Sequence, residues 1–478
     1  MISKGTAWIV KGTERQSRRA LTGNRPPDAA VKIVAMASRS MRNAAFFATS
    51  GADKHFFSRK RAVAVNGSSN ASTFIASTFL HAPVLQPYAA DWRLSRGRLC
   101  AEPASPTRGE FQRDRDRIIH STAFRRLAHK TQVFIPLDGD HFRTRLTHTI
   151  EVAQIARALA RGLGLDEDLA EATALSHDLG HTCFGHAGEE VLDACMTPYG
   201  GFDHNAHALR IVTALERRYA GWDGLNLCFE TLEGLVKHNG PLRDAKGAPV
   251  GRYVPRGAPR EIVAFDALFP LQLDTYASVE AQCAALADDI AYNAHDIDDG
   301  LRAGLFDLAD LQEIPLLRQL FGEIDALYPG LERVRIIHEL GRRIITRLVE
   351  DALTETQARL AALAPHSLDD IRGADRAMAA FSEPMASAVR QIKEFLFIRM
   401  YRHRMVLPVW KNAQRIVRGL FEHFMQNPQD LPAEWAETAQ ERDETGRARC
   451  IADYIAGMTD RYALGQARRW LDPAMALR

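Results

Sequence analysis

The sequence predicts a mostly α-helical protein built of many helices. From about residue 110 to the C-terminus, apolar residues recur at helical spacing, whereas the alternation typical of half-buried strands is scarce. The chain has 478 residues, which is enough for roughly two or three domain equivalents and a large buried core. Only residues 131–136 and 251–254 are fair candidates for strands.

The predicted helices follow one another along the chain. The first carries its apolar stripe through 118–127, the second covers 150–163 and is closed by Gly162 and Gly164, and the third covers 166–177. Segment 240–262 is rich in Pro and Gly and is predicted to be a long loop. The later predicted helices cover 278–299, 311–326, 331–363, 384–402 and 408–425.

Residues 1–85 differ in composition from the rest of the chain. Residues 1–90 hold 13 basic and 3 acidic residues, a net charge of +10, so residues 91–478 carry −8 although the whole chain carries +2. This composition favours a disordered basic tail; an organelle transit peptide and sequence translated from an upstream start codon are the alternatives. Such a tail is suited to weak binding of nucleic-acid phosphates.

The overall composition is that of a soluble globular protein. Hydrophobic residues make up 46% and charged residues 25%, which excludes a wholly disordered or collagen-like chain. The six cysteines occur singly, which excludes a disulfide framework and a thiolate zinc site and fits a reducing cytosol. No apolar run reaches the length of about eighteen residues that a membrane span needs. We therefore expect a cytoplasmic protein without a membrane anchor.

Histidine is concentrated in one part of the chain. Of 17 histidines, seven lie within 67 residues, interleaved with acidic residues and glycines: His141, His148, His177, His181, His186, His204 and His207. A single histidine is more often an ordinary core or surface residue than a ligand. Seven together predict a functional site.

The pair His177-Asp178 ends the third predicted helix. It can hold an ion over the helix end, and His148 can return beside it through a helical hairpin. A fourth, acidic ligand is best sought in 287–296, where Asp288, Tyr292 and Asp296 share a helix face, although such a stripe is also typical of a solvated surface. Two imidazoles and two carboxylates suit Mn, Fe, Co, Zn or Mg.

A second pair, His186 and Glu189, follows in a Gly-containing segment. Three residues apart on a helix, the two side chains can meet, and a carboxylate that holds an imidazole prepares it for proton transfer. The alternative is a glutamate that caps a helix beside an unrelated histidine.

These residues carry a resemblance to a known family. His148, His177-Asp178 and Asp288 look like the H…HD…D signature of HD-domain metal phosphohydrolases. The surrounding blocks resemble the bacterial deoxyguanosine-triphosphate triphosphohydrolase family, in its dGTPase-like branch, from about residue 87 to the C-terminus. The blocks are 113–121, 123–127, 130–134, 143–149, 200–205, 231–234, 237–238 and 453–462.

The resemblance implies an architecture, an activity and partners. It implies a multi-helix HD-domain core at 86–300 and a helical C-terminal region at 301–478 packed on it. The implied reaction cleaves a deoxynucleoside triphosphate (dNTP) to deoxynucleoside and tripolyphosphate with one divalent metal ion. Mn²⁺ or Mg²⁺ is favoured, with Fe, Co or Zn as alternatives. Relatives also imply a homo-oligomer and an allosteric dNTP.

The resemblance also assigns roles to individual residues. The implied metal ligands are His148, His177, Asp178 and Asp288. The implied catalytic pair is His186 and Glu189. The implied substrate-binding residues are Tyr292 and Asp296 at the deoxyribose, His181 and His204 at the triphosphate, and Arg145, Lys237 and Arg126 as further phosphate ligands. Cys183 departs from the family, which usually has proline there to stiffen the loop.

Two other functions remain open from the sequence. One is an HD phosphohydrolase of nucleoside monophosphates or cyclic nucleotides. The other is a nucleotide or nucleic-acid binding regulator with weak catalysis. The absence of a G-x-x-x-x-G-K-[ST] loop agrees with cleavage at the α-phosphate.

Overall fold

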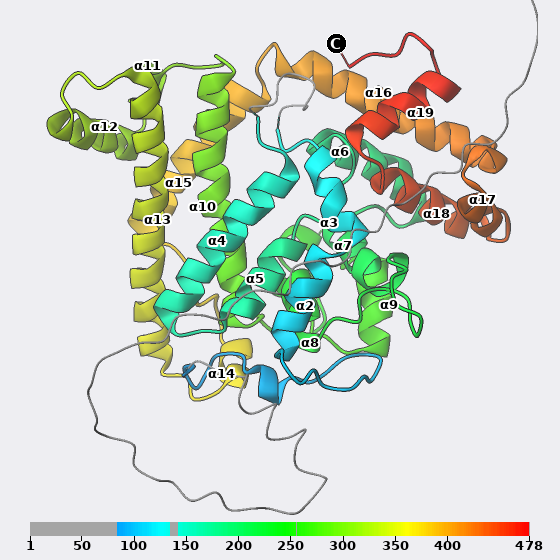
Figure 1. The fold of residues 1–478 in the computed structure, drawn as a ribbon, viewed down its shortest axis with the longest axis horizontal. Coiled ribbons are helices and arrows are strands. Elements are labelled where there is room, and N and C mark those ends of the chain that lie inside the picture. The colour runs from blue at the N-terminus through cyan, green and yellow to red at the C-terminus, as the bar shows by residue number, and fades with distance from the viewer. Residues whose placement is uncertain (1–83, 134–141, 255, 478) are drawn as a thin grey trace, which may run out of the picture. The chain divides into compact units, whose positions relative to one another are not determined.

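The computed structural model describes residues 84–133, 142–254 and 256–477. In these residues the chain forms helices joined by loops, with isolated β-bridges and no sheet (Figure 1). The predicted mostly α-helical fold is therefore confirmed. The predicted basic tail at 1–85 lies almost entirely outside the described residues.

The helices fall along the chain as follows. The first half contains α2 (Glu110–Ile119), α3 (Thr122–Arg126), α4 (Arg145–Leu163), α5 (Glu167–Ser176), α6 (Gly185–Met196), α7 (His204–Arg210), α8 (Phe229–Lys237) and α9 (Arg260–Leu268). The second half contains α10 (Val279–Arg302), α11 (Leu308–Leu311), α12 (Pro315–Leu327), α13 (Arg333–Leu363), α14 (Leu368–Arg372), α15 (Glu383–Leu396), α16 (Val406–Gln426), α17 (Ala433–Gln440), α18 (Glu444–Ala456) and α19 (Asp460–Trp470). A π-helical turn, η7 (Phe397–Tyr401), extends α15.

The first predicted helix is two helices in the structure. α2 ends at Ile119, and the side chain of Ser121 accepts a hydrogen bond from the backbone N–H of Phe124, which caps α3. Serine favours this capping position because its hydroxyl satisfies an N–H that has no partner within the helix. The apolar stripe continues across the break, which is why periodicity alone does not reveal it.

The prediction of a strand at 251–254 is wrong. Gly251–Tyr253 forms a 3₁₀ turn, and Gly251 has a φ of +56°, a value that glycine adopts without strain. In the other strand candidate, residues 131–136, Thr131 forms an isolated β-bridge to Thr144. The end of this candidate lies outside the described residues, which exclude 134–141.

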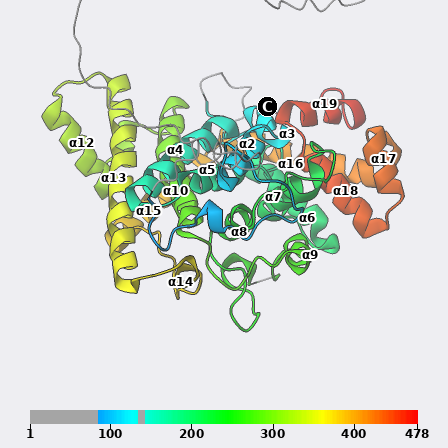
Figure 2. The ribbon, with the colours of Figure 1, turned by 60° about the horizontal axis from the view of Figure 1, so that its bottom comes forward.

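Helices α4, α5 and α10 form the centre of the molecule, side by side in both views (Figures 1 and 2). Thr144 caps the start of α4, Gly164 ends it with a φ of +68°, and Asp166 caps α5, so a tight turn reverses the chain. Val152 and Leu159 bury the inner face of α4, each stabilising the fold by about 1.5–3 kcal/mol. This packing brings the start of α4, the end of α5 and the middle of α10 together.

The C-terminal helices belong to two hydrophobic clusters. In the first, α13 packs against α10 through a row spaced four residues apart, Leu340, Ile344 and Leu348, which are fully buried. In the second, α16, α18 and α19 pack together with α6. α6 carries His186 and Glu189, so the C-terminal region supports part of the predicted site.

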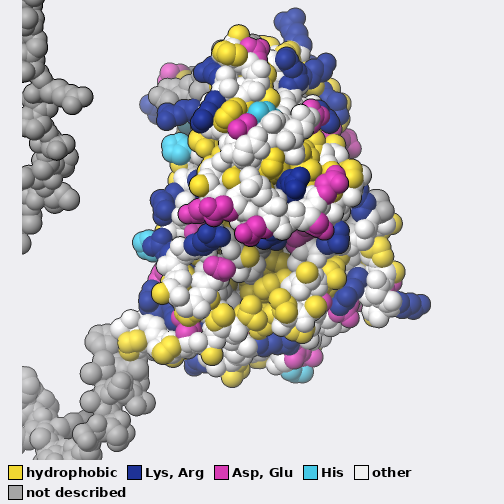
Figure 3. Space-filling model, turned by 90° about the vertical axis from the view of Figure 1, so that its right-hand side faces the viewer, with side chains coloured by type: hydrophobic (Ala, Val, Ile, Leu, Met, Phe, Trp, Pro, Cys, Tyr) yellow, Lys and Arg dark blue, Asp and Glu magenta, His cyan; other side chains and the backbone are white. Residues whose placement is uncertain are grey.

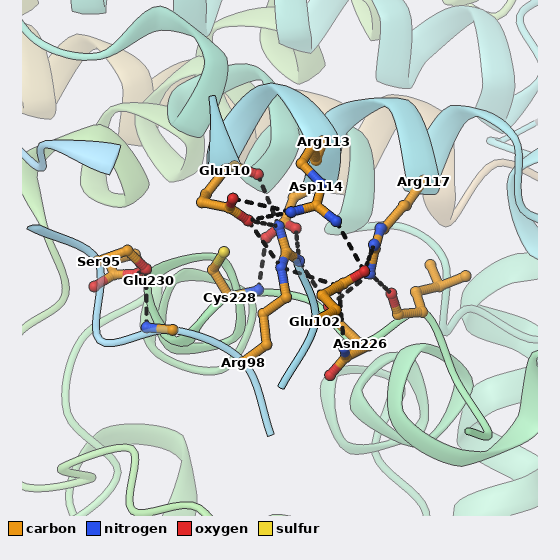
Figure 4. Close-up of polar contacts among 12 residues, drawn as sticks. Ser95, Arg98, Glu102, Glu110, Arg113, Asp114, Arg117, Asn226, Cys228 and Glu230 are labelled. Carbon is orange, nitrogen blue, oxygen red and sulfur yellow. Dashed lines mark hydrogen bonds and ion pairs between the residues drawn. The ribbon is translucent and has the colours of Figure 1, made fainter. Parts of the chain in front are cut away.

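A buried ionic network joins α2 to the segment that precedes α8 (Figure 4). Asp114 has no exposed surface; it pairs with Arg98 and accepts a hydrogen bond from the backbone N–H of Cys228 at 2.7 Å. Glu102 pairs with Arg113 and Arg117 at 2.8 and 2.7 Å. These contacts fix the point at which α8 begins.

We expect Asp114→Ala to destabilise the protein by about 1–3 kcal/mol. Arg98 keeps its pairs with Glu110 and Glu102, but the buried backbone N–H of Cys228 loses its acceptor, and an unsatisfied buried donor typically costs that much. Urea unfolding followed by circular dichroism measures the loss. The control is Asp116→Ala, whose half-exposed pair with Arg108 contributes about 1 kcal/mol or less. Equal losses in both variants would contradict the buried network's role.

The surface carries no single sign of charge on the face that Figure 3 shows. Basic and acidic side chains are interspersed there with hydrophobic ones. Because residues 91–478 carry a net charge of −8, any polyanion they bind would have to be attracted by local groups. Within the described residues, none of the helices is both long enough and apolar enough to span a lipid bilayer.

Candidate active site

Four predicted metal ligands meet at the junction of α4, α5 and α10. Ligand atoms of His148, His177 and Asp178 all lie within 4.8 Å of one another. Asp288 Oδ1 lies 2.9 Å from His148 Nε2 and 3.7 Å from His177 Nε2. The group can hold a divalent metal ion.

The ring orientation of His177 suits a metal ligand. Its Nδ1–H donates to the carbonyl oxygen of Ala174 at 2.6 Å, which leaves the lone pair of Nε2 free. His177 Nε2 and Asp178 Oδ2 are both buried without a hydrogen-bond partner. Because an unpaired buried polar atom is costly, these two atoms are what a bound cation would satisfy.

A chain of hydrogen bonds that the sequence did not reveal orients His148. Nδ1 of His148 lies 3.1 Å from Nδ1 of His295, and Nε2 of His295 lies 2.9 Å from the carboxylate of Glu151. Burial opposes ionisation of Glu151, but His295 and Arg143 outweigh it and lower its pKa to about 2. An ionised Glu151 accepts a hydrogen bond from Nε2–H of His295. Nδ1 of His295 in turn accepts one from Nδ1–H of His148, which leaves the lone pair on His148 Nε2 for the metal.

Arg145 lies at the site, but it contacts a predicted metal ligand. Its Nη1 is 2.8 Å from Asp178 Oδ1, and both side chains are buried. Burial alone would raise the pKa of Asp178; Arg145, His177 and His181 together hold that pKa well below its usual range. Arg145 therefore keeps Asp178 ionised.

The second predicted pair is part of a larger histidine group. Glu189 Oε2 lies 3.7 Å from His186 Nδ1, while Glu189 Oε1 lies closer, at 2.7 Å, to His204 Nδ1. His181 stacks on His204 with ring centroids 4.2 Å apart. Gly180 permits this approach, since a Cβ there would lie 1.9 Å from the carbonyl oxygen of His204.

The group has a defined charge distribution. Burial opposes protonation of His204, but the carboxylate of Glu189 outweighs burial and raises the pKa of His204. Burial, Arg145 and His204 lower the pKa of His181 well below its usual value. These shifts favour the protonated form of His204 and the neutral form of His181. His186 is 60% exposed and free to meet a ligand.

A cavity of about 600 Å³ opens beside His186. Its lining is mainly apolar and includes Tyr292, Tyr401 and Trp410. The Tyr401 hydroxyl donates to Asp296, and burial raises the pKa of the Asp296 carboxyl to about 8. Sequence patterns did not reveal Tyr401, because it comes from the π-helical turn η7 more than 100 residues after Asp296.

Contacts with the C-terminal helices hold the loop between His181 and His186. The buried Lys130 Nζ donates to the carbonyl oxygens of His181 at 2.5 Å and Ala456 at 2.8 Å, and burial lowers the pKa of Lys130 to about 7. Asp460 accepts from the backbone N–H of Phe184 at 2.7 Å. Its neighbours therefore hold the loop in place without a proline at position 183.

Two predicted phosphate ligands lie elsewhere in this structure. The side chain of Lys237 has no exposed surface, and its Nζ contacts Glu233, the Thr275 hydroxyl and the Gln272 carbonyl oxygen. All its donors are used, so this conformation does not support phosphate binding by Lys237. Arg126 lines a different cavity, beside Asp453.

Family models and known proteins match most of the chain. The HD domain model matches residues 145–293, and the phosphohydrolase-associated domain model matches 379–469. A deoxyguanosinetriphosphate triphosphohydrolase-like protein of Brucella anthropi is 58% identical over 386 residues, which cover 81% of this chain and 95% of the relative. The chain belongs to the deoxyguanosinetriphosphate triphosphohydrolase-like family.

Other members of this family match equally broadly. The protein of the same name from Bradyrhizobium diazoefficiens is 56% identical over 392 residues, covering 82% of this chain and 98% of the relative. That from Rhizobium johnstonii is 57% identical over 392 residues, covering 82% and 96%. Membership of this dGTPase-like HD phosphohydrolase family confirms the resemblance found from the sequence motifs.

Proposed function

We propose that this protein is a metal-dependent hydrolase that cleaves dNTPs to deoxynucleoside and tripolyphosphate. The observation that carries the proposal is the convergence of His148, His177, Asp178 and Asp288 beside His186 and an apolar cavity. A volume of about 600 Å³ is suited to a nucleoside. The names of the relatives make dGTP the first substrate to test.

The four converging side chains would hold one divalent ion. When bound, such an ion withdraws charge from a phosphoryl oxygen and lowers the pKa of water, and Mn²⁺ and Mg²⁺ are the first candidates. His204, protonated through Glu189, supplies positive charge for the triphosphate, and the neighbouring His181 offers a ring nitrogen. Arg145 contributes indirectly: it keeps Asp178 ionised, and an ionised Asp178 can help to hold the ion that would contact the phosphates.

His186 is the group we place at the leaving oxygen. It lines the nucleoside cavity, and its imidazolium form can donate a proton to the 5′ oxygen as the bond to the α-phosphorus breaks. Glu189 Oε2 lies 3.7 Å from Nδ1 of His186, close enough to orient the ring. General acid catalysis of this kind contributes about 10²–10⁴-fold.

Tyr292 and Asp296 would contact the deoxyribose. Tyr292 lines the cavity, and its ring stacks on that of Tyr401 with centroids 6.3 Å apart. Asp296 is fully buried and already accepts the Tyr401 hydroxyl, so a sugar hydroxyl that reaches Asp296 shares or replaces this contact. Tyr401 thereby becomes a candidate for sugar recognition.

Incubation of the purified protein with each dNTP and Mn²⁺ or Mg²⁺ tests the proposal. We expect equimolar deoxynucleoside and tripolyphosphate, with ¹⁸O from labelled water entering the tripolyphosphate. Nucleoside monophosphate plus pyrophosphate, or no turnover of any dNTP, would refute the proposal. Turnover of monophosphates or cyclic nucleotides alone would favour another phosphohydrolase activity, and nucleotide binding without turnover would favour a regulator.

A further inference from the structure

Two cavities adjoin at His186, and their linings differ in chemistry. The nucleoside cavity of about 600 Å³ has no Lys, Arg, Asp or Glu in its lining. A second cavity, of about 680 Å³, is lined by charged side chains, among them Glu189 and three arginines, Arg252, Arg256 and Arg260. His186 and Trp410 line both cavities, so the two lie next to each other. A dNTP has the same polarity, because it joins a nucleoside to a polyanionic tail.

Two of the three arginines hold the segment that precedes α9 in place. Arg252 pairs with Asp203, the residue that caps α7. Arg256 pairs with Asp193 of α6 at 2.7 Å. Asp203 directly precedes His204 in the chain, and α6 carries Glu189. The two ion pairs therefore fix this segment against the helices that carry the histidine group.

The third arginine, Arg260, is the first residue of α9 and has no such partner. Among the residues that the structure describes, its side chain makes neither an ion pair nor a hydrogen bond. It packs over Gly200, where a Cβ would lie 2.7 Å from Cδ of Arg260. A cation in the first turn of a helix is unfavourable, because it adds to the positive end of the helix dipole. The exposed guanidinium of Arg260 is therefore suited to an anion that enters the second cavity.

The carboxylates that line the second cavity have partners of their own. Four of them face a cation or a histidine: Glu189 pairs with His204, Asp193 with Arg256, Asp203 with Arg252, and Glu261 with Arg449. The fifth, Glu190, accepts a hydrogen bond from the side-chain amide of Gln414 at 3.0 Å. Within the described residues, Arg260 is thus the lining arginine that no carboxylate neutralises.

The two cavities set the direction of a bound dNTP. With His186 at the 5′ oxygen, the nucleoside extends into the apolar cavity and the phosphoryl groups extend towards the charged one. Glu189 lines the charged cavity and holds His204, which we place at the triphosphate. Arg260 is the further cation of this cavity that is free for an anion. A guanidinium also presents paired N–H donors, which match the oxygens of a phosphoryl group.

We propose that the second cavity binds the polyphosphate end of the dNTP and that Arg260 contacts its γ-phosphoryl group. This assignment rests on the proposed dNTP hydrolysis and adds to it the subsite for the third phosphoryl group. Arg260 is a binding residue here and takes no part in proton transfer or bond cleavage. Its loss should therefore weaken the binding of ligands that have the third phosphoryl group and spare those that lack it.

Binding of inorganic tripolyphosphate tests the subsite without turnover. Calorimetric titration of the full-length protein, with Mg²⁺ in excess over tripolyphosphate, measures the affinity. Arg260→Gln keeps a long side chain over Gly200 but removes the charge. We expect it to weaken tripolyphosphate binding at least about tenfold, because a hydrogen bond to a charged group contributes about that much, and to leave the affinity for deoxyguanosine unchanged. Arg376→Gln, at another exposed arginine, is the matched control and should change neither affinity.

Kinetics with two nucleotides tests the assignment of the γ-phosphoryl group. The nucleoside anchors dGTP and dGDP in the same direction, and dGDP lacks the third phosphoryl group. In Arg260→Gln the KM for dGTP should rise at least about tenfold with kcat unchanged, since the lost contact stabilises substrate and transition state alike. The inhibition constant of dGDP against dGTP turnover should stay at its wild-type value. An equal rise for both nucleotides would overturn the assignment to the γ-phosphoryl group.

The binding and turnover outcomes separate this subsite from the proposed function. If the wild-type protein binds no tripolyphosphate, or if Arg260→Gln keeps the wild-type affinity, the subsite is overturned even where dNTPs are hydrolysed. Equal losses in Arg260→Gln and Arg376→Gln would overturn it too, because they would reflect the overall charge of the protein. If tripolyphosphate binding depends on Arg260 but the wild-type protein hydrolyses no dNTP, the polyphosphate subsite stands and the proposed function fails.

Discussion

Replacement of Asp288 by asparagine is expected to abolish metal binding and turnover together. Asp288 Oδ1 lies within 2.9 Å of His148 Nε2 and 3.7 Å of His177 Nε2, so its carboxylate completes the group from α10. Desolvation would raise its pKa, but His177 and His148 outweigh desolvation and hold that pKa well below its usual range. The group therefore offers a full negative charge, which an amide cannot supply.

The expected loss in metal affinity is at least about 100-fold. Even changes in residues that only orient a metal ligand cost about 10–100-fold, and Asp288 is placed as a ligand itself. Titration with Mn²⁺, followed by electron paramagnetic resonance, measures the affinity. Turnover should stay at background at Mn²⁺ concentrations that saturate the wild-type protein. Partial recovery is expected only at much higher Mn²⁺ concentrations.

Asp289→Asn is the matched control for this prediction. Asp289 neighbours Asp288 on α10, but its carboxylate pairs with Lys393 at 2.7 Å and is half-exposed. The substitution removes the same charge one residue away from the predicted ligand. Equal loss of metal in both variants would contradict the placement of Asp288, because it would reflect the overall charge of α10 and not a specific ligand.

Local signals explain why the sequence brings the predicted metal ligands together. The capping residues Thr144, Gly164 and Asp166 define a hairpin, and this hairpin necessarily returns the start of α4 to the end of α5. His148 and His177 occupy those two positions. Helical periodicity alone could indicate a stripe of acids in 287–296, and the family motif selected Asp288.

The residues that support the site were not predictable in this way. The chain from Glu151 through His295 to His148 depends on how closely α4 packs on α10, and these helices are far apart in sequence. A weak retrospective signal exists, since Glu151 follows His148 by about one helical turn. The contact of Tyr401 with Asp296 depends in addition on a π-helical turn, which has no reliable sequence signature.

Lys237 and His238 illustrate why adjacency in a motif does not determine direction. Both belong to one block of the family pattern, and the basic residue was predicted to bind phosphate. In the structure the ammonium of Lys237 contacts Glu233 and the carbonyl oxygen of Gln272, whereas Nδ1 of His238 lies 3.0 Å from the carbonyl oxygen of Leu235. The rotation of α8 about its own axis decides this, and buried contacts at both of its ends set that rotation.

Substitution of His186 by alanine is expected to lower kcat by about 10²–10⁴-fold while the metal remains bound. His186 belongs to α6 and is not part of the group formed by α4, α5 and α10, so its loss leaves the four predicted ligands in place. Its exposed position beside the cavity also predicts little structural cost. Elemental analysis and thermal unfolding check both expectations. His366→Ala, an exposed change outside the site, is the control.

A change of leaving group tests whether His186 donates a proton. An alkoxide such as the 5′ oxygen needs protonation, whereas p-nitrophenolate leaves readily without it, because its conjugate acid is far stronger. The deficit of His186→Ala should therefore be large with a dNTP and much smaller with the p-nitrophenyl ester of tripolyphosphate. An equal deficit with both substrates would mean that His186 binds the α-phosphate in the transition state and does not act as the acid. Loss of metal would instead place His186 among the ligands.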